Sequence, residues 1–237
     1  MRFPSNLQRG RLLRRYKRFL ADVRLDSGAE VTASCPNTGS MLGLCEAGAV
    51  VWLSQSDSPT RKYPHTWQLT EHDLGMGRQL IGINTTLPNR LVETAIASGQ
   101  IPELAGYSSL RREVKYGLNS RIDLLLETAE GKRCYVEIKN VHMSRRAGLA
   151  EFPDCVSERA AKHLVELTRM VEEGHRAVMF YLVQRADTEA FQLAGDIDPA
   201  YARGFAKAQA AGVEAIVYGC DVRPDGIDIA RRLPFAC

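Results

Sequence analysis

Two short apolar segments decide the fold of this chain, and they read Ser120-Arg-Ile-Asp-Leu-Leu-Leu126 and Tyr135-Val-Glu-Ile-Lys-Asn-Val141. The short polar gap between them predicts two adjacent strands. Such strands would expose the carboxylate of Asp123 beside Glu137 and Lys139. Residues two apart on a strand share a face, so we expect Glu137 and Lys139 to point the same way.

Two carboxylates beside a lysine predict a metal-dependent nuclease site. Carboxylate oxygens bind hard divalent cations, and we expect Asp123 and Glu137 to hold Mg²⁺ or Mn²⁺. The cation would polarise a phosphoryl group and generate hydroxide, while Lys139 would orient the water or offset charge. The alternative is an ion pair between Lys139 and one carboxylate at an exposed sheet edge, since Glu-x-Lys alone is a weak signal.

Two more polar residues could join this site. Glu93 lies at the border of the apolar face of a helix predicted over residues 90–98, with Asn89 as its N-cap. It could add a third catalytic carboxylate, and the alternative is a solvated helix residue. Gln184 ends a continuous apolar strand and could reach the same cleft, although a structural role is favoured.

A longer helix is predicted over residues 157–173. Its residue His163 has charged neighbours, which indicate a polar face of the helix. Those neighbours are Arg159, Lys162 and Glu166. We expect this face to be solvated, with contact to DNA as the alternative. Lys115 and Arg121 flank the predicted site and could hold phosphates.

The net charge of +3 is unevenly distributed along the chain. The first 20 residues carry seven cations and no acid, so the remaining residues together carry −4. A basic arm on a mildly acidic body predicts a local contact with a polyanion. The alternative interpretation, which is compatible with such a contact, is a strand whose apolar residues face a core while its cations are solvated. The residues expected to bind nucleic acid are Arg9, Arg11, Arg14, Arg15, Lys17 and Arg18.

The order of predicted elements divides the chain into residues 1–82 and 83–237. In the first domain, short strands alternate with turn signals at close spacing, which predicts a small β barrel. In the second we expect a helix, three strands, a helix, a strand, a helix and a strand. Short connections make the three strands antiparallel, whereas the crossover helix makes the next strand parallel to its partner. The expected class is α+β, with a mixed sheet covered by helices.

Composition narrows the class of protein further. Hydrophobic residues make up 45% and charged residues 25% of the 237, as in ordinary globular proteins. No apolar run is long enough to span a bilayer, and the first residues lack the apolar core of a secretory signal. We therefore expect a cytoplasmic protein with no membrane partner. The six cysteines form no Cys-x-x-Cys pair and are expected to be small apolar residues in a reducing compartment.

Several short motifs are spread over the whole chain. They read Arg9-Gly-Arg-Leu, Cys35-Pro-Asn-Thr-Gly-Ser-Met-Leu42, Glu113-Val-Lys-Tyr-Gly, Ser120-Arg-Ile-Asp, Val136-Glu-Ile-Lys-Asn-Val, Phe152-Pro-Asp, Glu158-Arg and Lys162-His-Leu. Together they closely resemble the sugar fermentation stimulation protein A family. The resemblance implies a bacterial or archaeal protein that binds DNA largely without sequence preference and is linked to the regulation of sugar (maltose) use. It also implies an N-terminal OB-like barrel and a C-terminal restriction-endonuclease-like domain.

The second domain also resembles the wider PD-(D/E)xK nuclease superfamily. By that resemblance, the catalytic Asp, Glu and Lys of the superfamily match Asp123, Glu137 and Lys139, and a helical Glu matches Glu93. Ile122 stands where the superfamily signature has Pro, at a position that varies within the superfamily. The complete set implies that the residues required for this chemistry are still present, and the resemblance leaves open whether DNA is cleaved.

The expected function is therefore that of a DNA-binding protein, for single or double strands, with a Mg²⁺-dependent phosphodiesterase site. The main alternative is a DNA-binding transcriptional regulator that cleaves nothing, in which the carboxylates have a structural or metal-sensing role. A weaker alternative is an RNA-directed protein, since OB barrels also take RNA. A homodimer would place two sites on two strands, although nothing in the sequence marks an interface.

Overall fold

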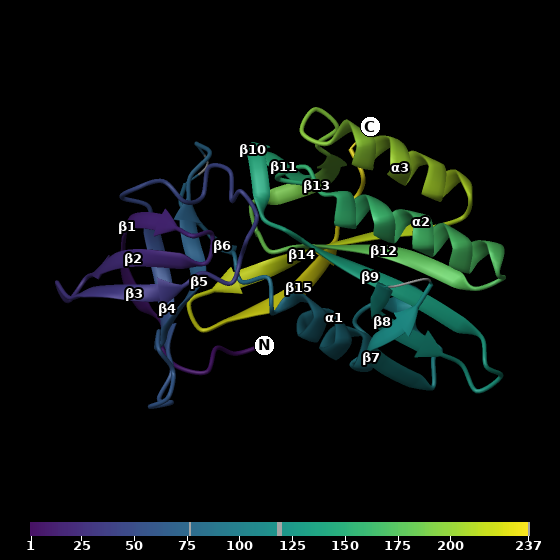
Figure 1. Ribbon diagram of the computed structural model, residues 1–237, viewed down its shortest axis with the longest axis horizontal. Helices are drawn as coiled ribbons and strands as arrows, with labels where there is room; N and C mark the ends of the chain where they lie inside the picture. The colour runs from purple at the N-terminus through teal and green to yellow at the C-terminus, as the bar shows by residue number, and fades with distance from the viewer. Residues whose placement is uncertain (76, 118–119, 237) are drawn as a thin grey trace.

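A closed five-stranded barrel forms the first unit of the computed structural model, which describes residues 1–75, 77–117 and 120–236 (Figure 1). Antiparallel pairing runs from β3 through β2, β1 and β4 to β5, and a short parallel pairing of β3 with β5 closes the barrel. This confirms the predicted barrel. The strands are β1 (Gln8–Tyr16), β2 (Leu20–Leu25), β3 (Glu30–Ser34), β4 (Val50–Gln55) and β5 (His65–His72), with β6 (Gln79–Gly82) paired to β5.

The basic arm of the sequence is strand β1 of the barrel. Leu12 is buried in the barrel core with Trp67, while neighbouring cations face outward. Gly10 allows β1 and β2 to approach closely, because a Cβ added there would lie 2.6 Å from the carbonyl oxygen of Arg24. The alternation of apolar and charged residues therefore builds a strand, as the alternative interpretation of the arm predicted.

A six-stranded mixed sheet organises the second unit, in the order β15-β14-β12-β9-β8-β7. β7, β8 and β9 are antiparallel, and β12 pairs in parallel with both β9 and β14. Both relations confirm the predicted meander and crossover. The strands are β7 (Ser109–Tyr116), β8 (Ser120–Glu127), β9 (Arg133–Val141), β12 (Arg176–Val183), β14 (Glu214–Arg223) and β15 (Gly226–Arg232).

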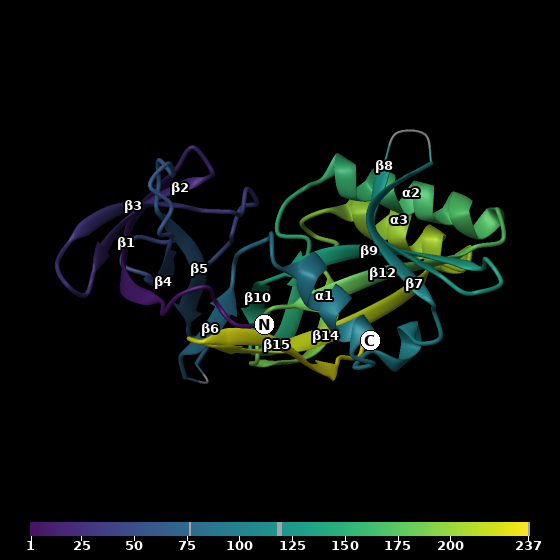
Figure 2. The same ribbon diagram turned by 90° about the horizontal axis from the view of Figure 1, so that it is seen from below.

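Three helices cover the two faces of this sheet (Figure 2). α2 (Glu158–Glu172) and α3 (Pro199–Ala210) pack on one face, and α1 (Pro88–Ala97) packs on the other. The Oγ of Ser157 caps α2 by accepting a hydrogen bond from the Ala160 N–H. The three predicted helices are thus confirmed, and the predicted bounds of the first two agree to within two residues.

Several short elements carried too weak a pattern to be predicted. β10, β11 and β13 form a small separate sheet, and β15 adds an antiparallel edge to the main one. Their runs are short or mixed in polarity, so no period of two stands out. These elements are β10 (Met143–Arg146), β11 (Gly148–Phe152), β13 (Thr188–Leu193) and the 3₁₀ turn η1 (Pro102–Leu104).

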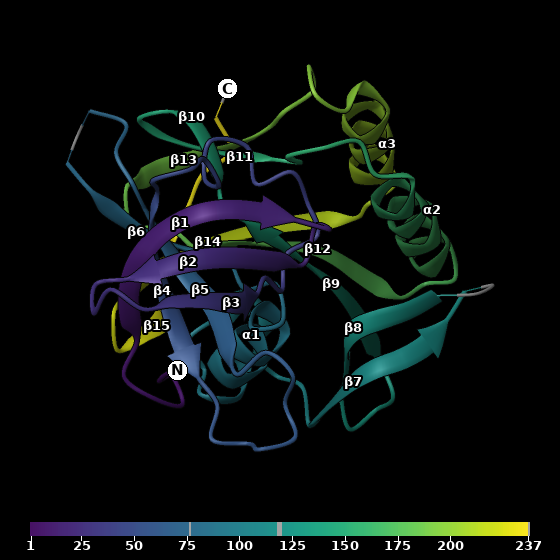
Figure 3. The ribbon, with the colours of Figure 1, turned by 60° about the vertical axis from the view of Figure 1, so that its left-hand side comes forward.

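The two units contact each other directly, and Figure 3 shows the barrel in front of the main sheet. The N–H of Gly82 donates to the carbonyl of Gln184 at 2.9 Å, and the N–H of Thr85 donates to that of Pro36 at 3.0 Å. The ammonium of Met1 also donates to the carbonyl of Ile227 at 2.6 Å, so the first residues lie against β15. These contacts hold the first unit against the main sheet at the end of β12, before α1 and along β15.

Two further expectations concern the state of the cysteines and the presence of membrane-spanning helices. Cys35, Cys134 and Cys220 are buried, Cys45 and Cys155 are partly exposed, and all five are free thiols. Cys237 lies outside the described residues. Among the described helices, none has both the length and the apolar character needed to cross a bilayer.

Candidate functional site

Asp123 is positioned where strands β8 and β9 stop pairing. Their register runs from Glu127 opposite Arg133 to Leu124 opposite Val136 and ends there. Beyond that point the Asp123 Oδ2 accepts the N–H of Ile138 at 2.7 Å, so the side chain takes the place of a ladder hydrogen bond. The carboxylate is thereby fixed between the two strands.

Asn89 holds the other oxygen of this carboxylate. Its Nδ2 donates to the Asp123 Oδ1 at 2.9 Å from the first turn of α1. The prediction that Asn89 caps the helix is wrong, because α1 begins at Pro88 and the Leu87 cap position has no side-chain hydrogen bond. Proline fits the first helical position without a cap, since its missing N–H would have no partner there. This leaves the Asn89 amide free to orient the carboxylate.

Glu137 is the most buried member of the site, with 2% of its surface exposed. Its Oε1 accepts a hydrogen bond from the Nζ of Lys139 at 2.8 Å and contacts the Nδ1 of His163. Its Oε2 is buried and has no hydrogen-bond partner among the described residues. A buried carboxylate oxygen without a partner is costly, so this atom is available to a ligand.

The two carboxylates have different affinities for a proton. Burial and the charge of Glu137 raise the pKa of Asp123 from its ordinary value of 3.8 to about 6. Burial alone would also raise the pKa of Glu137, but Lys139 and His163 outweigh it and lower that pKa below its ordinary value. At neutral pH both groups are therefore ionised, and a cation would relieve the cost of keeping Asp123 charged.

His163 was expected on a solvated face, and that prediction is wrong. The imidazole is buried, with 6% of its surface exposed, and its Nδ1 also lies 3.4 Å from the Nζ of Lys139. The spacing of the sequence contains the signal, because Ala160, His163, Leu164 and Leu167 follow the i, i+3, i+4, i+7 pattern of a buried helix face.

The charged neighbours of His163 on α2 differ in their exposure to solvent. Glu166 is buried as well, against the solvated face expected for it, whereas Arg159 and Lys162 are exposed as predicted. Arg159 lines the cleft next to His163. The helix therefore presents one buried imidazole and two exposed cations to the region of the site.

Glu93 and Gln184 lie apart from the pair of carboxylates. Glu93 points to the edge strand β7, where its Oε1 lies 3.4 Å from the Nε of Arg112, and it does not line the cleft. Gln184 is fully buried, and its Nε2 donates to the side-chain oxygen of Asn140. Of the four predicted catalytic residues, the structure thus brings together Asp123, Glu137 and Lys139.

The site opens into a cleft of about 470 Å³ between the two units. The second unit contributes the two carboxylates and Lys139, together with Arg159 from α2. The barrel contributes Arg18 and the loop of residues 37–39. Both units therefore contact anything bound in the cleft, which the sequence did not indicate.

Most cations of the basic arm are held by acceptors of the barrel itself. Arg9 and Arg14 pair with carboxylates, and Arg11 donates to the carbonyl of Gly48. Arg15 donates to four backbone carbonyls, those of Arg18, Asn37, Gly39 and Ser40, at 2.8 to 3.3 Å. Arg15 thus fixes the two loops that line the barrel side of the cleft.

The tip of the β1–β2 hairpin is the part of the arm that faces the cleft. Lys17 and Arg18 have φ values of 50° and 64°, in the left-handed region that non-glycine residues rarely adopt. The guanidinium of Arg18 donates to the carbonyl of Thr38 and lines the cleft, while Lys17 is exposed. Among the six predicted nucleic-acid contacts, Arg18 is the one that lines the cleft.

Asp154 ties the barrel to the wall of the cleft. Its Oδ2 accepts the N–H of Met41 at 2.9 Å, Ser40 donates its hydroxyl to the same residue, and the Nε2 of His142 lies 3.3 Å away. Burial would raise the pKa of Asp154, but these contacts hold it well below its ordinary value. Asp154 belongs to the Phe152-Pro-Asp motif, and nothing in the sequence of that motif indicates this contact with the barrel.

The donor set fits a small hard cation. Asp123 and Glu137 offer carboxylate oxygens, and the free Oε2 of Glu137 offers an open position. The described residues contain no group of three or more His, Cys, Asp or Glu side chains in metal-binding arrangement. Mg²⁺ is commonly held by one or two carboxylates, with waters and substrate phosphates as its remaining ligands. The two carboxylates therefore suffice for that kind of site.

Comparison with known proteins agrees with the architecture. Residues 13–83 match the model of the SfsA N-terminal OB domain, and residues 86–226 match that of the sugar fermentation stimulation protein RE domain. The sugar fermentation stimulation protein homolog of Rhodospirillum centenum is 58% identical over 98% of both chains. That of Brucella ovis is 56% identical over 99% of this chain and 97% of its own.

One solved structure has the same fold throughout. The structure of Pyrococcus furiosus SfsA in complex with Ca²⁺ aligns with a TM-score of 0.89 and 26% sequence identity, covering 100% of this chain and 98% of that one. The predicted OB-like barrel and restriction-endonuclease-like domain are thereby confirmed.

Proposed function

The chain belongs to the sugar fermentation stimulation protein family, and we propose that it binds DNA and hydrolyses phosphodiester bonds in the cleft with a divalent cation. One observation carries the proposal: the buried carboxylate of Glu137, whose Oε2 has no partner among the described residues, beside the ionised Asp123. The Pyrococcus furiosus relative was solved in complex with Ca²⁺, a hard cation that takes oxygen ligands.

The residues of the cleft would take separate roles. Asp123 and Glu137 would hold Mg²⁺ or Mn²⁺, which supplies a bound water of lowered pKa and neutralises charge on the phosphate. The ammonium of Lys139 would orient the attacking water or offset the charge that develops on the phosphate. Asn89 and His163 act through the two carboxylates, because each one fixes a carboxylate oxygen. They are positioning residues.

The two units would hold the nucleic acid together. Arg18 reaches the cleft from the barrel and Arg159 from α2, so a strand in the cleft would contact both. Guanidinium groups recognise phosphate oxygens with two parallel hydrogen bonds. Because Arg18 is the arm cation that lines the cleft, we assign the phosphate contact chiefly to these two arginines.

A cleavage assay tests the proposal. Labelled single-stranded, duplex and branched DNA would be incubated with Mg²⁺ or Mn²⁺ and the wild type, Asp123→Asn or Lys139→Ala. Asp57→Asn is the matched control, because Asp57 is an exposed loop residue outside the cleft. We expect both site variants to lose cleavage and to keep binding, and the control to keep both. Equal cleavage by wild type and Asp123→Asn would refute the proposal.

Binding without cleavage on all substrates would favour the alternative of a DNA-binding regulator. In that case divalent cations should still stabilise the wild type, since a metal-sensing role needs the same two carboxylates. Competition between DNA and RNA of equal length tests the third alternative, an RNA-directed protein. Size measurement in solution, with and without DNA, tests for a homodimer.

A further inference from the structure

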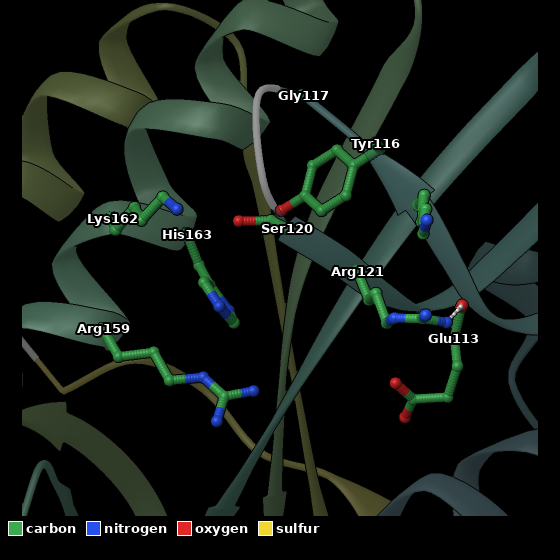
Figure 4. A pocket seen from close by; sticks show the side chains of 9 residues that line it. Glu113, Tyr116, Gly117, Ser120, Arg121, Arg159, Lys162 and His163 are labelled. Atoms are coloured by element: carbon green, nitrogen blue, oxygen red, sulfur yellow. Dashed lines mark hydrogen bonds between the residues drawn. The ribbon is translucent and has the colours of Figure 1, made fainter.

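A second cavity, of about 720 Å³, opens beside the cleft between the β7–β8 hairpin and α2 (Figure 4). Arg159 and His163 line both spaces, so the two adjoin along this stretch of α2. Of the residues that line this cavity, the roles proposed above use Arg159 and His163 alone. A strand bound at the two carboxylates would therefore have this space within reach along its own backbone.

The charge of the cavity is strongly positive. Its lining contains four exposed cations against one carboxylate, that of Glu113. Figure 4 shows Arg159 and Lys162 on the helix side and Arg121 on the hairpin side, so the cations come from two separate elements. A hollow lined by one sign of charge concentrates ions of the opposite sign. The four cations are Lys115, Arg121, Arg159 and Lys162.

These cations are weakly engaged by the protein. The guanidinium of Arg121 donates to the carbonyl of Glu113 at 3.1 Å, and the Nζ of Lys162 lies 3.7 Å from the Oε1 of Glu166. The described part of the chain provides no ion pair for Lys115 or Arg159. This contrasts with the arm of β1, where carboxylates and carbonyls occupy most of the cations.

Tyr116 provides a second and independent sign of a ligand. The residue is 7% exposed, it lines the cavity, and its hydroxyl has no hydrogen-bond partner among the described residues. In Figure 4 the hydroxyl points toward the space between the hairpin and α2. Burial and the nearby carboxylates raise the pKa of Tyr116, so the group stays protonated and can donate. A buried donor without an acceptor is costly, and a phosphate oxygen would supply the acceptor.

We propose that this cavity binds a second phosphate of the nucleic acid, beside the phosphate that lies at Asp123 and Glu137. The identification of the ligand as nucleic acid rests on the proposed function. The recognising groups are the cations of the hairpin and of α2, with the hydroxyl of Tyr116 as a further donor. A terminal phosphate monoester and an internal phosphodiester share this chemistry, and the test below distinguishes them.

The test measures binding in EDTA, so it does not depend on cleavage. The probes are short fluorescent single-stranded oligonucleotides with a 5′-phosphate, a 3′-phosphate or hydroxyl ends only. The full-length variants are Arg121→Ala, Lys162→Ala and Tyr116→Phe, with thermal unfolding as the check on folding. Lys207→Ala is the matched control for Lys162→Ala, because Lys207 is an exposed helical lysine of α3 outside the cavity.

We expect each of the two charge-removing variants to raise the Kd about tenfold, the size of one lost charge-assisted contact. Tyr116→Phe should raise it by about three- to tenfold, as for a lost neutral hydrogen bond, and should not destabilise the fold. Lys207→Ala should bind like the wild type. If the wild type binds one phosphorylated probe more tightly than the probe with hydroxyl ends, and the variants lose this difference, the cavity binds a terminal phosphate. If the variants bind all three probes more weakly by the same factor, the cavity binds an internal phosphate.

Two negative results have different meanings. If the wild type binds the probes and the cavity variants bind them equally well, the second phosphate site is refuted while the proposed function stands. If the wild type binds none of the probes, single-stranded or annealed to a complement, the proposed function itself fails. Weakening by Lys207→Ala as large as that by Lys162→Ala would also refute the site, because the effect would then be one of net charge.

Discussion

Replacing Asp123 with Asn should remove the free-energy cost of burying an ionised carboxylate. It should also remove one of the two ligands proposed for the cation. The pKa of Asp123 is raised from 3.8 to about 6 in the folded protein, chiefly by burial and then by the charge of Glu137. Between these two values the folded state binds more protons than the unfolded state. Stability therefore falls as the pH rises through this window.

The size of the effect follows from the shift. A shift of about two pKa units costs about 3 kcal/mol once the carboxylate is ionised in both states, near pH 8. About half of that cost is already present at pH 5. Asn carries no charge, but it can accept only one of the two hydrogen bonds that Ile138 and Asn89 donate, which costs about 1 kcal/mol. Metal-free Asp123→Asn should thus be about 2 kcal/mol more stable than the wild type at pH 8 and about 0.5 kcal/mol more stable at pH 5.

Urea unfolding in EDTA at the two pH values measures this difference. Asp57→Asn is the control, since an exposed loop residue should change stability by less than about 0.5 kcal/mol at either pH. Adding Mg²⁺ should stabilise the wild type and leave Asp123→Asn unchanged, because only the intact pair of carboxylates binds the cation. An Asp123→Asn protein whose advantage over the wild type is no larger at pH 8 than at pH 5 would refute the reasoning.

Four other outcomes are expected. Glu93→Gln should retain cleavage within about twofold, because Glu93 faces Arg112 and not the cleft; a large loss in the cleavage assay would return it to the catalytic set. His163→Ala should lower cleavage by about 10- to 100-fold with DNA binding unchanged, since it fixes the Glu137 carboxylate. Arg15→Ala should lower the free energy of unfolding by about 2 kcal/mol, measured with urea, and Arg15→Lys should recover part of that loss. Binding of DNA should weaken steeply with rising salt, and a Kd that is equal at low and high salt would contradict a phosphate-based contact.

The strongly patterned parts of the fold could be predicted from the sequence, because local physics dominates there. α2 has a serine cap, a glycine just past its end and an apolar stripe at helical spacing, and β12 is a continuous apolar run. The strands of the small sheet could not be predicted, since β10 is short and β11 pairs in parallel with β13, which lies far away in the sequence. Such pairings contribute stability only after the rest of the chain has folded.

Some features of the candidate site could likewise be predicted from the sequence, and others could not. Asp123, Glu137 and Lys139 could be predicted because strand geometry fixes which side chains share a face and which strands are neighbours. The burial of His163 depends on how α2 lies across β9, and the role of Asn89 depends on where α1 meets β8. Neither relation follows from residues close in the sequence, although the spacing around His163 offered a signal.

Periodicity and turn chemistry are local properties, so the sequence was sufficient to predict the two-unit architecture and the three residues of the candidate site. The tertiary structure alone decided that the barrel forms part of the cleft. It also decided that most cations of the arm are held by acceptors of the protein, and that four weakly engaged cations of β7, β8 and α2 line a second cavity. The physical reason is that a charged side chain takes whatever acceptor the folded chain brings within reach, and that choice is made by contacts between segments far apart in the sequence.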